Sequence, residues 1–136
     1  MILIVDDDPL SRKYLSALLA SSGYEKPLTA QNASEAQHLA VSERPRLALI
    51  EMRLPGTSGF VLVRELRSRE PTRSIRIIGI SADVRGMIET AALDAGCDCY
   101  FGRPFDVPLL LDTVSTYLSD ASLPSPACFT NRGQIP

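Results

Sequence analysis

Five short and almost continuously apolar segments alternate with helical patterns along this chain of 136 residues. The predicted strands cover residues 2–6, 28–31, 47–51, 75–81 and 99–102. Strands that are apolar on both faces and separated by helices indicate a parallel sheet with helices on both sides. The pattern therefore predicts one α/β domain, and it excludes an all-helical or an all-β fold.

Capping signals mark where the helices between these strands begin. Asp8 and Pro9 are typical of the first positions of a helix, and Asn32 followed by Glu35 has the spacing of a capping box. Asp83 is a third predicted cap. Periodicity is lost near residue 120, so we expect a domain over residues 1–120 and a flexible, proline-rich tail or linker over 121–136.

Charge and composition exclude several classes of function. The net charge of −2 gives no general attraction to nucleic acid, and we interpret Arg64, Arg67, Arg69, Arg73 and Arg76 as a solvated helix face with its following loop. No apolar run is long enough to cross a membrane, and a strand directly after Met1 leaves no room for a signal peptide. With three cysteines and no paired spacing, a cytoplasmic location is expected.

Carboxylates follow two of the predicted strands. Asp6 and Asp7 end the first strand, and Glu51 ends the third. Ligands of open parallel sheets bind at the carboxyl ends of the strands, so these acids are expected to converge. Like charges tolerate this only when a cation joins them, and carboxylates suit Mg²⁺. Ser81 and Arg103 end two further strands and complete a candidate site for a phosphoryl group.

Four motifs carry a family resemblance. These are Val-Asp-Asp-Asp-Pro at residues 5–9, the loop at 53–59, Ile-Ser-Ala at 80–82, and the stretch 96–104 that ends in Arg-Pro. The chain resembles a receiver domain of two-component response regulators over residues 2–119. The resemblance implies a flavodoxin-like (βα)5 sandwich with strand order 2-1-3-4-5.

The resemblance also implies roles for individual residues. Asp6 and Asp7 would be the metal-binding pair, with the backbone carbonyl of Arg53 as a further ligand. Ser81 would bind a phosphoryl oxygen, and the rotamer of Tyr100 would report the active state. The peptide bond before Pro104 is expected to be cis.

Two positions depart from the family pattern. Glu51 stands where the family has its phosphoacceptor Asp, and Arg103 stands where it has Lys. Glu reaches about 1.5 Å further than Asp, and Arg grips carboxylates through a planar fork. These changes predict a Glu51–Arg103 ion pair, with Glu51 as a stand-in for the phosphorylated acid and with Mg²⁺ binding weakened or absent.

Several alternatives stay open at this stage. The site could be a decayed remnant, or a conventional receiver phosphorylated on Glu51 or a neighbouring Asp. A Mg²⁺-dependent phosphotransferase or phosphohydrolase would need a capping insertion, and the short connections argue against an enzyme. The expected partner is a sensor kinase or an output protein, bound through the fourth helix, fifth strand and fifth helix, with a homodimer as an alternative. The sequence does not identify the pathway or an output domain after residue 136.

Overall fold

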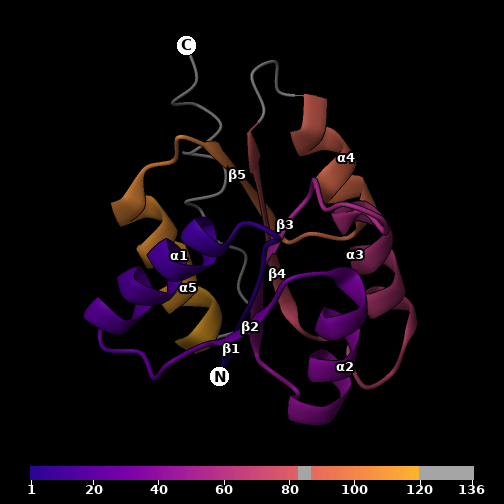
Figure 1. Cartoon of the computed structure of the whole chain (residues 1–136), viewed down its shortest axis with the longest axis horizontal. Coiled ribbons are helices and arrows are strands. Elements are labelled where there is room, and N and C mark those ends of the chain that lie inside the picture. The colour runs from indigo at the N-terminus through magenta and orange to yellow at the C-terminus, as the bar shows by residue number, and fades with distance from the viewer. Residues whose placement is uncertain (83–86, 120–136) are drawn as a thin grey trace.

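One parallel sheet with helices on both faces forms the domain (Figure 1). The computed structural model describes residues 1–82 and 87–119, with only the backbone of Met87. The strands are β1 (Ile2–Val5), β2 (Leu28–Ala30), β3 (Leu47–Glu51), β4 (Arg76–Ala82) and β5 (Cys99–Arg103). The helices are α1 (Pro9–Ser21), α2 (Ala33–Glu43), α3 (Gly59–Ser68), α4 (Met87–Ala95) and α5 (Val107–Ser119). The order β2-β1-β3-β4-β5 confirms the predicted flavodoxin-like fold.

Two hydrophobic cores lie on opposite faces of the sheet. Helices α1 and α5 cover one face, and α2, α3 and α4 cover the other (Figure 1). Alternate residues of β1, β3, β4 and β5 point into different cores, as Leu3 and Ile4 of β1 do. No helix among the described residues is long and apolar enough to span a membrane.

Side chains at the helix starts act as the sequence predicted. Asp8 accepts the Leu10 N–H at 3.2 Å, and Asn32 accepts the Glu35 N–H at 2.9 Å. Glu35 reaches back to Gln31 rather than to Asn32, and hydrogen bonds from the backbone and side chain of Gln31 lower the pKa of Glu35. The predicted Asp83 cap and the predicted tail from residue 121 lie outside the described residues.

The interpretation of the arginine group as a solvated face was wrong for Arg67 and Arg76. Both side chains are partly buried and bind the carboxylate of Asp98, at 2.7 Å and 3.0 Å. Asp98 also accepts the backbone N–H of Ile77 at 2.8 Å, and Arg76 lies over the Tyr117 ring. A long-range ion network therefore joins α3, β4, α5 and the start of β5, which helical periodicity alone does not reveal.

Gly59 places the start of α3 directly against the end of β3. A Cβ atom at this position would lie 2.5 Å from the Glu51 carbonyl oxygen and 2.6 Å from the Met52 Cα. The Gly59 N–H donates to the Met52 carbonyl at 3.1 Å, which closes the intervening loop. Because the obstructing atoms are backbone, no rotamer change can make room for a side chain.

We predict that Gly59→Ala lowers the free energy of unfolding by about 3 kcal/mol, since overpacking against backbone must displace α3 or β3. Chemical denaturation measures the loss. Val61→Ala, at a position 41% exposed on the same helix, is the matched control and is expected to change stability by less than about 0.5 kcal/mol. Equal effects of the two substitutions would contradict the close packing at Gly59.

Candidate functional site

Charged and polar side chains from four strands meet at the carboxyl edge of the sheet. Asp6 directly follows β1, Glu51 ends β3, Ser81 lies near the end of β4, and Arg103 ends β5. The side chains of Asp6 and Glu51 are only 4% and 9% exposed, while that of Arg103 is 30% exposed. Two nearly buried carboxylates thus lie beside one accessible guanidinium group.

The guanidinium of Arg103 bridges the two carboxylates. Its Nη1 donates to Oε1 of Glu51, and its Nη2 donates to Oδ2 of Asp6 at 3.1 Å. Nη2 also donates to the Ser11 hydroxyl at 2.9 Å. The ion pair predicted between Glu51 and Arg103 is therefore present, and it extends to a second acid and to helix α1.

Backbone N–H groups bind the other oxygen of each carboxylate. Oε2 of Glu51 accepts the Arg53 N–H at 3.0 Å, and Oδ1 of Asp6 accepts the Asp8 N–H at 3.0 Å. These bonds fix the orientation of both carboxylates before any ligand arrives.

The residues expected to bind a metal are arranged unevenly. Asp6 is buried in the bridge, whereas Asp7 and Arg53 are exposed at the rim. Among the described residues, no three His, Cys, Asp or Glu side chains lie close enough to hold a metal ion. The cationic side chain of Arg103 already occupies the space between Asp6 and Glu51. The carboxylate oxygens, in this arrangement, do not fit Mg²⁺. The metal-binding role of Asp6, Asp7 and Arg53 stays a prediction.

Ser81 and Tyr100 lie on the neighbouring strands β4 and β5. The Ser81 hydroxyl is fully buried and has no hydrogen-bond partner among the described residues, whereas its backbone carbonyl accepts the Tyr100 hydroxyl at 3.2 Å. Tyr100 is 2% exposed. Glu51 contacts Arg103 and not this hydroxyl, so one polar group that the sequence assigned to phosphoryl binding has no acceptor within the described part of the chain. The Arg103–Pro104 peptide bond is cis, as expected.

Two residues of α1 contribute to the site and were not predicted. Ser11 accepts from Arg103, and Arg12 donates through Nη1 to the backbone carbonyl of Asp6 at 2.6 Å. Both lie in the first turn after the Asp8 cap, at the end of α1 that adjoins the acids. A polar and a basic residue at the end of a helix that adjoins acidic side chains indicate contacts with those acids. The apolar periodicity of the helix indicates only its buried face, so it does not reveal them.

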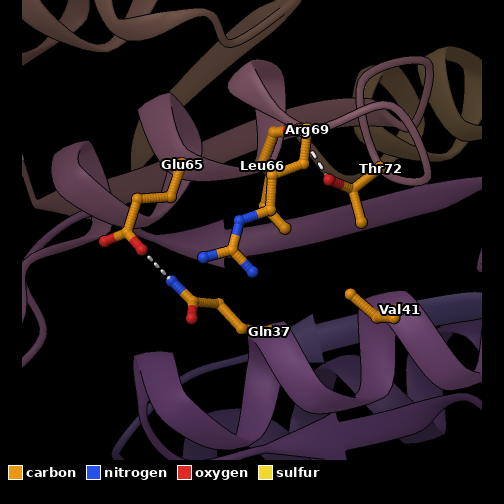
Figure 2. Close-up of a pocket in the computed structure, with 6 residues that line it drawn as sticks. All are labelled: Gln37, Val41, Glu65, Leu66, Arg69 and Thr72. Carbon is orange, nitrogen blue, oxygen red and sulfur yellow. Dashed lines mark hydrogen bonds between the residues drawn. The ribbon is translucent and has the colours of Figure 1, made fainter.

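The crevices and depressions described below provide no enclosed pocket at the acid site. Figure 2 shows the crevice between α2 and α3, where Gln37 faces Glu65 and the Thr72 hydroxyl bonds the Leu66 carbonyl. It leaves about 0 Å³ for a water-sized molecule, so it is too narrow to hold a ligand. An open depression of about 430 Å³ lies beside Arg103 and is lined by Tyr14, Pro104 and Phe105.

We predict that Ser81→Ala leaves the free energy of unfolding unchanged or raises it by up to about 1 kcal/mol, because it removes a buried hydroxyl that has no partner in residues 1–82 and 87–119. Thr72→Val is the matched control: it removes a buried hydroxyl bonded at 2.6 Å, and a loss of about 1 kcal/mol is expected. Denaturant titration compares the two. A larger loss in Ser81→Ala than in the control would show that Ser81 has a stabilising partner.

We predict a coupling free energy of about 1–2 kcal/mol between Glu51 and Arg103, because their ion pair lies in a largely buried site. A double-mutant cycle of Glu51→Gln and Arg103→Met measures it by denaturation. Coupling close to zero would mean that solvent screens the pair.

Comparisons with known proteins place this geometry in a family. Residues 2–115 match the family model of the response regulator receiver domain. The chain is 34% identical over 120 residues to the polar-differentiation response regulator DivK of Brucella anthropi, covering 88% of this chain and 97% of that protein.

Solved structures agree with this match. The receiver domain of NtrX from Brucella abortus superposes with a TM-score of 0.79 at 25% identity, covering 88% of this chain and 98% of that one. A response regulator receiver protein from Pseudomonas putida gives a TM-score of 0.75 at 28% identity, covering 85% and 94%. With its strand order and its acids at the carboxyl edge, the chain belongs to the receiver domains of two-component response regulators.

Proposed function

We propose that this receiver domain signals without phosphorylation, as a protein-binding module in which Glu51 replaces the phosphorylated acid. The ion pair between Glu51 and Arg103 is the observation that carries the proposal. A phosphoacceptor must present a free carboxylate oxygen in line with the donor phosphorus, within fractions of an ångström. Both oxygens of Glu51 instead accept hydrogen bonds, from Arg103 and from the Arg53 N–H.

Charge balance supports the same proposal. Transfer of a phosphoryl group adds negative charge, which a receiver neutralises with a cationic side chain and a metal. Here the guanidinium of Arg103 already neutralises charge on Asp6 and Glu51. An incoming phosphoryl group would have to separate this pair, which is costly because both carboxylates are nearly buried.

Ser81 and Tyr100 connect the acid site to the conformation of β4 and β5 in this proposal. Tyr100 is buried, and its hydroxyl bonds the carbonyl of Ser81 at the carboxyl end of β4. We propose that the Glu51–Arg103 pair holds β5 and the end of β4 in one conformation, so that Tyr100 keeps this buried rotamer without a phosphate. The signal would then depend on the presence of the protein and not on its modification.

Receiver domains act by binding other proteins, such as kinases and output domains. For this chain we propose contact through α4, β5 and α5, with a homodimer through the same face as an alternative. Leu109, Leu111 and Leu118 support this surface, because they stay partly exposed on α5 while packing against the core. We assign no enzymatic activity, no direct nucleic-acid contact and no membrane contact to the domain.

A conventional receiver is the second candidate. Asp6 and Asp7 are retained at the end of β1, and Asp7 is exposed to solvent. These acids keep part of the chemistry that phosphorylation by a sensor kinase needs. The two candidates differ in whether the isolated protein takes up phosphate.

We predict that the wild-type protein, incubated with Mg²⁺ and acetyl phosphate, gains no phosphoryl group by intact-mass measurement. The double variant Glu51→Asp/Arg103→Lys is expected to gain one, because the shorter acid frees the nucleophile and Lys cannot form the fork.

The matched control for this experiment is Glu51→Gln/Arg103→Lys, which lacks a carboxylate at the acceptor position and is expected to stay unmodified. Uptake of one phosphoryl group by the wild-type protein would overturn the proposed function. Fragmentation of that product would then locate the acceptor on Glu51 or on a neighbouring Asp.

A further inference from the structure

We infer that the guanidinium of Arg103 is the resident cation of this acid site and makes the site independent of divalent metal. The inference deepens the proposed function and rests on it, because a domain that transfers no phosphoryl group has no need of a metal. It starts from the poor fit between Mg²⁺ and the donor set at the carboxyl edge.

The first argument is position. A divalent ion that served this site would lie between the acids of β1 and β3, bound to an oxygen of each. The two terminal nitrogens of Arg103 make these two contacts, Nη1 to Glu51 and Nη2 to Asp6. The planar fork of arginine spans two acceptors at once, which the point charge of lysine does not.

The second argument is competition for space and charge. Mg²⁺ binds oxygen ligands at about 2.1 Å and keeps several waters in an octahedral shell. Such an ion between Asp6 and Glu51 would displace the guanidinium or repel it at contact distance. Arg103 and a metal ion would therefore compete for the same two carboxylates, and binding of the metal would break the ion pairs of Arg103.

The third argument is that helix α1 fixes the guanidinium in place. Ser11 accepts from the same Nη2 that binds Asp6, so Arg103 makes three side-chain hydrogen bonds. Arg12 brings a second guanidinium to the backbone carbonyl of Asp6. Two arginines from different elements therefore surround Asp6, and the local field disfavours a further cation.

A titration with Mn²⁺, followed by the paramagnetic resonance signal of the free ion, tests the inference on the full chain. We expect the wild-type protein to bind Mn²⁺ at least about tenfold more weakly than Arg103→Gln, which opens the space between the acids without changing them. Lys13→Gln is the matched control: it removes one positive charge from an exposed position of α1 and is expected to bind as weakly as the wild type.

Thermal melts of each variant with and without Mn²⁺ show whether the protein folds and whether the metal stabilises it. Should Arg103→Gln not fold in the absence of metal, Arg103→Lys retains a cation without the fork and is expected to bind Mn²⁺ more tightly than the wild type. Equal affinities of the wild type and of the folded Arg103 variants would overturn the inference.

The outcomes also separate this inference from the proposed function. A wild-type protein that binds Mn²⁺ as tightly as Arg103→Gln, yet takes up no phosphate, overturns the resident cation alone. A wild-type protein that takes up phosphate overturns the proposed function, whatever its affinity for Mn²⁺.

Discussion

The contact of Arg103 with two acids determines how the carboxyl edge of this domain is built. Asp6 and Glu51 extend from adjacent strands into nearly the same volume, and without a cation their charges would repel inside a poorly solvated site. Arg103 lies on β5, a strand at the edge of the sheet, and forms an ion pair with each acid. The strands of this sheet can therefore bring their acidic ends together because the chain carries its own counter-charge.

Much of the fold could be predicted from local patterns, because those patterns are set by neighbours in sequence. Apolar runs specify the buried strands, and the caps at Asp8 and Asn32 specify where α1 and α2 begin. Strand ends were less well predicted, since Ala82 and Arg103 extend β4 and β5 by pairing with each other in the sheet. The order of the strands came from the family resemblance and not from the pattern itself.

The site was predicted in part. The meeting of Asp6, Glu51 and Arg103 follows from their places at the ends of parallel strands, and the pairing of Glu51 with Arg103 follows from their chemistry. The contribution of Ser11 did not follow, because it depends on a contact across many residues of chain. The ion network at Asp98, which lies outside the site, was missed for the same reason. Such contacts depend on how helices rotate against the sheet, which local periodicity leaves undetermined.

The ion network at Asp98 lies at the amino ends of β4 and β5, away from the acid site. It joins β4, the start of β5, α3 and α5 through partly buried hydrogen bonds. The register of these two strands is thus held from the end that carries no candidate chemistry. The alignment of β4 and β5 therefore does not depend on which side chains stand at the acidic edge, since the contacts that hold the two strands in register lie at their other end.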